Sequence, residues 1–255
     1  MKLTANNKTI DFFEFDDSQF DRVFLALSGG TDSAMLLYLT CIEKPDWKIV
    51  CHTGIDKHKD PWVGEYAAEI VDFMQKRFPH VDIVHEQYKF NSLDPIWLYR
   101  AEKDWNAHPN KETLPTIQGH AKAVAAKPHK HELRKKYDIK LSMHGITANP
   151  PIEVQEKLGF IDVAEPRRNL VYDEFDWKKS GNLHYTPFIN VDKRFVAELY
   201  KQYDLLDDLF PLTRSCIGFE KETDYFTRPC EECFWCHEKM WAFGTYDPVP
   251  WIKIQ

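Results

Sequence analysis

The sequence predicts an α/β protein with a mostly parallel sheet and a small zinc-binding segment near its C-terminus. Two observations predict the sheet: short apolar runs alternate with longer helical patterns, and a glycine-rich turn follows the first run. Four cysteines crowded into residues 216–236 predict the metal site. A chain of 255 residues is long enough to bury a substantial core as one large domain with an appendage.

Four short apolar runs are expected to form the strands of the sheet, because runs of this length are typical of strands buried on both faces. They are Arg22 to Leu27, Lys48 to Thr53, Val81 to His85 and Ile139 to His144. Helices are expected over Ala34 to Leu39, Pro61 to Arg77, Gln118 to Ala126 and Val191 to Tyr203. Residues 88–135 are long for a connection between strands, so we treat them as an insertion. We expect a sheet domain at residues 1–190 and a helical tail at 191–255.

Composition and charge exclude several classes of protein. No apolar run reaches the roughly 18 residues of a membrane helix, and the start of the chain, Met1 to Asp17, is too polar and acidic for a signal peptide. Six cysteines are too few for a disulfide scaffold. We therefore expect a cytoplasmic protein that makes no membrane contact.

The net charge is −7, but residues 111–140 hold eight Lys and Arg against three acids. This segment is a candidate RNA contact or simply a solvated helix face.

The turn after the first predicted strand reads Ser28-Gly29-Gly30-Thr31-Asp32-Ser33. Consecutive glycines let backbone N–H groups turn toward one anion, and the following helix adds its free amides and positive dipole end. The two serines supply hydroxyl donors, while Asp32 caps the helix or helps to hold Mg²⁺. No Gly-Lys-Ser/Thr follows, so the turn is a phosphate cradle but not a Walker A loop.

The full Ser-Gly-Gly-x-Asp-Ser string resembles the pyrophosphate loop of the N-type ATP pyrophosphatases, or PP-loop proteins. This resemblance implies a Rossmann-like domain of the adenine nucleotide alpha hydrolase-like (HUP) type. It also implies cleavage of ATP between its α and β phosphates, with Mg²⁺ as the metal and Asp32 as a catalytic residue. The ATP-binding residues would be Ser28, Gly29, Gly30, Thr31, Asp32, Ser33 and Thr53.

The clustered cysteines read C-x13-C-x2-C-x2-C, at Cys216, Cys230, Cys233 and Cys236. Two-residue spacings let neighbouring thiolates converge on one tetrahedral ion, and the distant cysteine closes the set. A closed set of four thiolates favours structural zinc, although an iron–sulfur cluster uses the same ligands.

The C-terminal third resembles that of the 7-cyano-7-deazaguanine synthases, which combine the same loop with a four-cysteine zinc site. The matching stretches include Pro187, Lys193, Leu212 to Cys216 and Pro229 to Cys236. The resemblance implies that ATP activates a purine-like acid, that ammonia then attacks, and that Lys193 reaches the phosphates. The thirteen-residue spacing between the first two cysteines and the sequence His144 to Pro151 depart from that family, so the acceptor stays open.

Two alternatives compete with this interpretation. His52-Thr53-Gly54 resembles the Asp-Thr-Gly of phosphoadenylyl-sulfate reductases and related sulfur-transfer enzymes, which places Thr53 beside a nucleotide. The other alternative is a non-catalytic RNA-binding module that uses residues 111–140 and the cysteines. Loop and strand-end positions make Asp56, His58 and His144 candidate substrate contacts. A homodimer is the expected assembly.

Overall fold

The computed structural model describes residues 1–13, 15–107, 117–157, 183–218 and 222–249. In this part of the chain, five parallel strands form a central sheet in the order β5-β4-β3-β6-β7. The strands are β3 (Arg22–Ala26), β4 (Lys48–Asp56), β5 (Asp82–Phe90), β6 (Leu141–His144) and β7 (Leu183–Tyr185). The strand order reverses between β3 and β6, and in doubly wound sheets this switch point opens a crevice at the carboxyl ends of the strands. The predicted parallel α/β sheet is confirmed.

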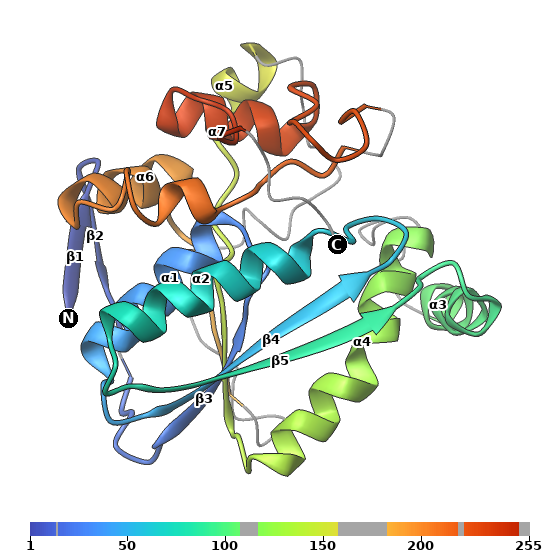
Figure 1. Ribbon diagram of the computed structural model, residues 1–255, viewed down its shortest axis with the longest axis horizontal. Coiled ribbons are helices and arrows are strands. Elements are labelled where there is room, and N and C mark those ends of the chain that lie inside the picture. The colour runs from blue at the N-terminus through green and yellow to red at the C-terminus, as the bar shows by residue number, and fades with distance from the viewer. Residues whose placement is uncertain (14, 108–116, 158–182, 219–221, 250–255) are drawn as a thin grey trace.

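Helices cover both faces of the sheet (Figure 1). α1 (Thr31–Glu43) and α2 (Val63–Arg77) lie on one face, and α4 (Ile117–Lys136) lies on the other. The alternation of side chains along β3 explains this arrangement, because successive residues of a strand point to opposite faces. Val23 and Leu25 join the main core under α1 and α2, while Phe24 packs with Leu133 of α4.

The C-terminal segment packs onto the same core. α6 (Lys193–Gln202) contacts α1, and its Phe195 and Leu199 belong to the core cluster that contains the sheet. The Asp192 carboxylate caps α6 by accepting a hydrogen bond from the Arg194 N–H. After the short helix η3 (Phe210–Leu212) and the cysteine-rich segment, α7 (Phe234–Phe243) packs against α6. The hydrophobic core thus continues across residue 190, where we expected the sheet domain to end.

An N-terminal β-hairpin was not predicted. It pairs β1 (Lys2–Ala5) with β2 (Lys8–Asp11) in an antiparallel ladder. Asn6 and Asn7 form its turn with φ of 48° and 58°, the left-handed conformations that a two-residue hairpin turn requires. Only Leu3 and Ala5 of the hairpin strands are buried, so the apolar signal in the sequence is weak.

The described parts of residues 88–135, where we expected an insertion, are the end of β5 and two helices that lie between β5 and β6 in the chain. Residues 88–90 continue β5, and α3 (Pro95–Ala107) packs against α4, which covers the sheet. The helix predicted at Gln118 to Ala126 is longer than expected, because α4 continues through Pro128 to Lys136. A short helix, α5 (Ile152–Lys157), follows β6.

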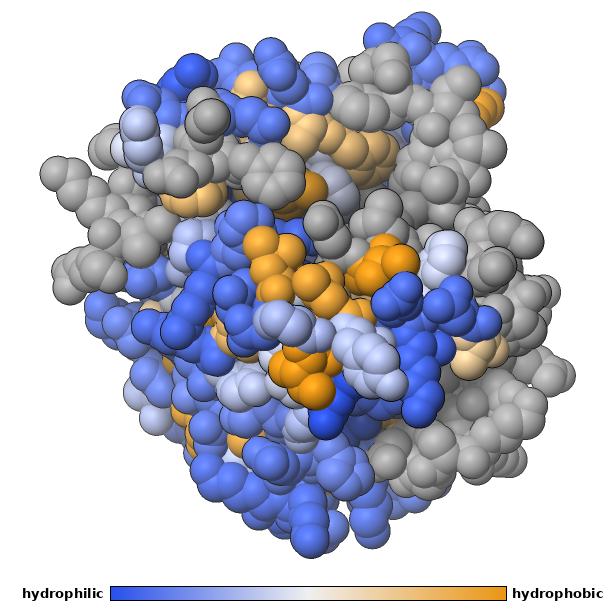
Figure 2. All heavy atoms as spheres, turned by 90° about the vertical axis from the view of Figure 1, so that its right-hand side faces the viewer, coloured by the Kyte–Doolittle hydropathy of each residue, from blue (hydrophilic) through white to orange (hydrophobic). Residues whose placement is uncertain are grey.

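The side of the molecule that carries α3 is mostly hydrophilic (Figure 2), with a small group of apolar side chains near its centre. On α3 itself, Ile96 and Tyr99 are exposed. Within the described residues, no helix combines the length and the apolar character that a bilayer crossing requires.

Candidate nucleotide-binding site and metal centre

A cavity of about 680 Å³ opens at the switch point of the sheet. A volume of this size is typical of a pocket for a nucleotide-sized ligand. Its walls come from the ends of β3 and β6, the first turn of α1, one side of α4 and the cysteine-rich segment. Its lining includes Ser28, Gly30, Thr31, Asp32, His52, Gly54, Asp60, Lys122, Lys130, Gly145, Lys193 and Arg214.

The predicted phosphate cradle lines part of this cavity. Gly29 has φ +74°, a left-handed conformation that glycine adopts without strain, and Gly30 is the N-cap of α1. The Ser33 hydroxyl donates to the Gly30 carbonyl at 3.1 Å and accepts the Ser28 N–H at 3.2 Å, which fixes the shape of the turn. The first turn of α1 leaves amides without intrahelical acceptors, and the dipole of α1 adds a positive end. The loop therefore has the geometry of an anion-binding site.

Gly145, directly after β6, lets this strand end approach the cradle closely. A Cβ atom at this position would lie 2.7 Å from the Asp32 carbonyl carbon and 2.8 Å from the Ser33 nitrogen. No side chain fits there without moving the first turn of α1. The sequence marked Gly145 only as the end of a strand, since its role depends on a contact between distant parts of the chain.

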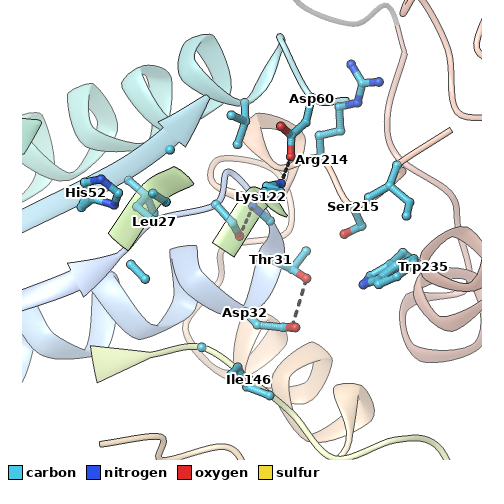
Figure 3. Close-up of a pocket in the computed structure, with 18 of the residues that line it drawn as sticks. Leu27, Thr31, Asp32, His52, Asp60, Lys122, Ile146, Arg214, Ser215 and Trp235 are labelled. Carbon is cyan, nitrogen blue, oxygen red and sulfur yellow. Dashed lines mark hydrogen bonds and ion pairs between the residues drawn. The ribbon is translucent and has the colours of Figure 1, made fainter. Parts of the chain in front are cut away.

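Asp32 and Lys193, the two residues predicted to be catalytic, lie together beside the cradle. Lys193 Nζ is 3.0 Å from Asp32 Oδ2 and 3.2 Å from Glu238 Oε2, and the Lys193 side chain is 3% exposed. Thr31 Oγ1 donates to Asp32 Oδ1 at 3.2 Å, as Figure 3 shows. Glu238 on α7 is fully buried, and no motif in the sequence signalled it. The lysine is thereby held at the loop by two carboxylates.

Thr53 turns away from the cavity. Its hydroxyl donates to the Leu27 carbonyl at 2.9 Å, so it must accept its second hydrogen bond, also 2.9 Å, from His85 Nε2–H. Because side chains alternate along β4, its neighbours His52 and Gly54 line the cavity instead. Burial lowers the pKa of His52 to about 3, with Lys130 and His129 adding to the effect, so this ring is neutral.

The three candidate substrate residues occupy different environments. Asp56 is fully buried, and its Oδ1 accepts the N–H groups of His58 and Ser92, so it shapes the loop after β4. The His58 side chain is exposed to solvent. His144 is half-buried at the end of β6, where burial and nearby cations lower its pKa to about 3. None of the three is among the residues that line the cavity in the described part of the chain.

The four predicted metal ligands converge. All four Sγ atoms lie within 4.8 Å of one another, with Cys216 and Cys230 at 3.5 Å and Cys230 and Cys236 at 3.9 Å. A tetrahedral ion with Zn–S bonds of about 2.3 Å holds its sulfurs about 3.8 Å apart, so the set fits zinc. Backbone N–H groups point at the sulfurs, as in the outer shell of thiolate metal sites: those of Gly218 and Cys230 lie 3.3 Å from Cys216 Sγ.

The four-cysteine set is joined to the cradle by the residues just before and at Cys216. The Arg214 N–H donates to the Gly29 carbonyl at 2.8 Å, and the Ser215 and Cys216 N–H groups donate to Asp247. Asp247 is in turn paired with the buried Lys239. The Arg214 guanidinium points away from the cradle (Figure 3) and lies 4.0 Å from the centroid of the Trp62 ring. The backbone of the cysteine segment is therefore hydrogen-bonded to the cradle, while the Arg214 side chain does not face it.

Three further cavity residues were not predicted as site residues. Lys122 of α4 forms an ion pair with Asp60, shown in Figure 3, and Lys130 lies further along the same helix. The sequence placed both lysines in a basic segment with a surface role. Their alternation with Ala121, Ala125 and Ala126, all buried, is the signal that this helix faces the sheet.

These features define the class of the site: an anion cradle at the switch point of a doubly wound sheet, next to a four-thiolate centre. No protein-family model matches the chain, and no curated protein matches it significantly.

Three of the solved structures that match the chain are nucleotide- or tRNA-related enzymes. NMN synthetase from Francisella tularensis is 13% identical, with 92% of this chain and 82% of that chain covered and a TM-score of 0.49. The U34-tRNA thiolase NcsA from Methanococcus maripaludis, solved with its [4Fe-4S] cluster, is 15% identical over 89% of this chain and 72% of that one, with a TM-score of 0.45.

The third is glutamine-dependent NAD+ synthetase from Acinetobacter baumannii in complex with ADP. It is 16% identical over 80% of this chain and 34% of that one, with a TM-score of 0.43. Because all three TM-scores lie below 0.5, we base the assignment of function on the geometry of the site.

Proposed function

We propose that this chain is an ATP-dependent enzyme that forms AMP and pyrophosphate by adenylating an acceptor substrate. The observation that carries the proposal is the Ser28–Ser33 cradle, whose amides face a nucleotide-sized cavity at the switch point of the sheet. Lys193, Lys122 and Lys130 line the same cavity and supply cationic groups there. Phosphates are the ligands that such an arrangement of amides and cations recognises.

The residues suggest how the reaction proceeds. An oxygen of the acceptor attacks the α-phosphorus, the bond to the α–β bridging oxygen breaks, and pyrophosphate leaves with that oxygen. The amides of the cradle and the Lys193 ammonium neutralise the charge that develops on the leaving pyrophosphate. Mg²⁺ bound to the triphosphate would supply further neutralisation, and Asp32 is the carboxylate at the cradle that could take it as a ligand.

For the acceptor, we propose a carboxylate on a purine-like ring, with ammonia as the nucleophile that replaces AMP, as in the 7-cyano-7-deazaguanine synthases. The joint presence and order of the loop, Lys193 and the four cysteines support this choice. Zinc at the thiolates would have a structural role, because the four sulfurs leave no open coordination position.

The test is to incubate the purified protein with ATP, Mg²⁺, 7-carboxy-7-deazaguanine and ammonium, and to quantify products by ³¹P NMR. We expect AMP and pyrophosphate in equal amounts, formed only when the acceptor is present. The matched control is Asp32→Ala, which should lose turnover while remaining folded, because Glu238 still neutralises Lys193. If the protein binds ATP tightly but forms no AMP, the proposed acceptor is wrong. If the product is ADP, the protein does not adenylate its substrate.

A second candidate is a sulfur-transfer enzyme built on the same cradle. The convergence of four thiolates supports it, because an iron–sulfur cluster has the same ligand requirement as zinc. Metal analysis of protein purified without oxygen separates the two. One colourless zinc ion per chain favours the ligase, whereas iron with a brown chromophore favours sulfur transfer.

A further inference from the structure

A group of basic side chains lies beneath α4, on the face of the sheet that this helix covers. It consists of Lys130 and Arg134 from α4, His144 from β6, His184 from β7, and the Ser142 hydroxyl between them; we call it the basic cluster. The nucleotide-binding role proposed above leaves it unused, apart from the contribution of Lys130 to the cavity wall.

Strand register and ring contacts place these groups together. Ser142 is the Cα partner of Phe24 on one side and of His184 on the other. The Arg134 guanidinium lies 5.5 Å from the centroid of the Phe24 ring. Arg134 therefore lies over β3, next to Ser142 of β6. The rings of His144 and His184 are stacked, with centroids 6.0 Å apart.

Within the described residues, the basic cluster has no anionic partner. Arg134 Nε and Ser142 Oγ are shielded from solvent and have no hydrogen-bond partner among the described residues, and neither Lys130 nor Arg134 forms an ion pair with any of them. Burial lowers the pKa of Lys130, and the neighbouring Arg134 and Lys122 lower it further. The pKa of His184 is lowered by burial and by Arg134 and Lys130.

Unpaired cations in a shielded position are costly, because burial removes their hydration and no opposite charge replaces it. Two fixed cations, two imidazoles and a hydroxyl donor on one face of the sheet match the needs of an oxyanion. An oxyanion bound there would accept these hydrogen bonds and offset the repulsion among the cations.

We propose that the basic cluster binds a carboxylate or phosphate group of the acceptor substrate and thereby holds the acceptor beside the nucleotide. Lys130 belongs both to the cluster and to the cavity wall, which connects the two sites. The acceptor is then a small molecule with an anionic group. This inference rests on the proposed adenylation for its functional meaning, but anion binding itself does not require turnover.

The test is calorimetric titration of the full-length protein with inorganic phosphate or with acetate, after the cradle has been saturated with α,β-methylene-ATP and Mg²⁺. The analogue keeps phosphate out of the cradle. We expect saturable binding to the wild type and about tenfold weaker binding to Arg134→Gln, because one charge-assisted hydrogen-bonding group is removed. The stronger of the two probes identifies the anion as phosphate or carboxylate.

Lys135→Gln is the matched control, since Lys135 is exposed on the same helix one residue away. It should bind both probes like the wild type. No binding to the wild type, or equal binding to Arg134→Gln, would overturn the proposal. Binding of an RNA oligonucleotide that depends on Arg134 and is tighter than that of either probe would overturn its small-molecule part.

Thermal unfolding gives a second readout that a folding defect cannot mimic. Without added anion, Arg134→Gln should melt no lower than the wild type, because an uncompensated cation is removed. Phosphate or acetate should raise the melting temperature of the wild type and of Lys135→Gln but not that of Arg134→Gln. A lower melting temperature for Arg134→Gln in anion-free buffer would show that the protein already compensates this charge. If the ATP analogue fails to bind, the proposed adenylation is wrong. The effect of phosphate or acetate on the melting temperature, and its dependence on Arg134, still tests the basic cluster separately.

Discussion

Lys193 connects two carboxylates from opposite ends of the chain. It lies between Asp32 at the start of α1 and Glu238 on α7, and only 3% of its side chain is exposed. The lysine is the shared partner of both carboxylates, so its removal takes the paired cation from each of them. At the scale of single residues, this contact links the cradle to the C-terminal helix.

We predict that Lys193→Met lowers the free energy of unfolding by about 3–5 kcal/mol, since the buried Glu238 carboxylate and Asp32 then lose the cation that pairs with both. Urea denaturation measures the loss. The double variant Lys193→Met/Glu238→Gln should regain more than half of the lost stability, because the buried carboxylate that the lysine neutralised is no longer charged. If the double variant is as unstable as the single one, the two side chains are not energetically coupled.

Gly145→Ala should weaken nucleotide binding. Its new Cβ would overlap the Asp32 backbone, so the first turn of α1 must move. We expect about 1–3 kcal/mol of destabilisation, as in other overpacked sites, and at least about tenfold weaker binding of α,β-methylene-ATP. Gly244→Ala is the control: it has φ +75° and open space around it, so it costs stability but leaves the cradle intact. Equal losses of nucleotide affinity in both variants would contradict a specific role for Gly145.

At the scale of elements, the sequence predicted the strands and helices with a strong apolar pattern. β3 was predicted to within one residue at its end, and β6 to within two residues at its start. β5 was expected to end at His85 but continues to Phe90, because it is an edge strand whose polar side chains alternate with apolar ones. α4 was expected to stop before Pro128, but packing against the sheet and α3 outweighs the hydrogen bond that proline lacks.

The cysteine segment links the proposed metal site to the loop, since the Arg214 N–H donates to the Gly29 carbonyl two residues before Cys216, one of the four converging cysteines. Metal removal should therefore weaken binding of α,β-methylene-ATP by about tenfold or more. Calorimetry before and after treatment with a zinc chelator, with Mg²⁺ restored, measures this effect, and re-addition of zinc should reverse it. Unchanged affinity in demetallated protein would show that the segment supports the loop without its metal.

At the scale of the whole molecule, the sequence predicted the functional motifs better than it predicted the contacts between distant side chains. The cradle and the four cysteines are local motifs, so they were recognisable, and the structure brings each set together. Lys130, Arg134, Gly145 and Glu238 come from elements far apart in the chain. Their roles depend on strand order and helix packing, which no local pattern in one sequence encodes. Thr53 was assigned to the nucleotide, yet strand alternation turns it the other way.

Stability should fall on mild acidification, because several histidines are neutral in the folded protein. The pKa of His52 and of His144 is lowered to about 3, mainly by burial. Their neighbours are Lys130, His129, His85 and Glu86 for His52, and Lys130, His184 and Arg134 for His144. Below about pH 6.5 the unfolded chain takes up protons that the folded protein excludes. The stabilisation is therefore complete above pH 6.5 and is lost as the pH falls toward 3.

Each of these two histidines should lower the free energy of unfolding by at most about 2 kcal/mol between pH 7 and pH 5. Urea denaturation at both pH values measures the difference. A His144→Asn variant should show a smaller difference, whereas His58→Asn, at an exposed position, should behave like the wild type. An identical pH dependence in His144→Asn would mean that this ring titrates normally.

The central claim is that the amides at the start of α1 bind the phosphates that ATP releases. A crystal structure of the protein with α,β-methylene-ATP and Mg²⁺ tests it most directly. The account predicts the β and γ phosphates within hydrogen-bonding distance of the Gly30 to Ser33 N–H groups, with Lys193 beside them. A triphosphate bound elsewhere in a crystal with a fully occupied ligand, or a cradle that stays empty, would contradict it.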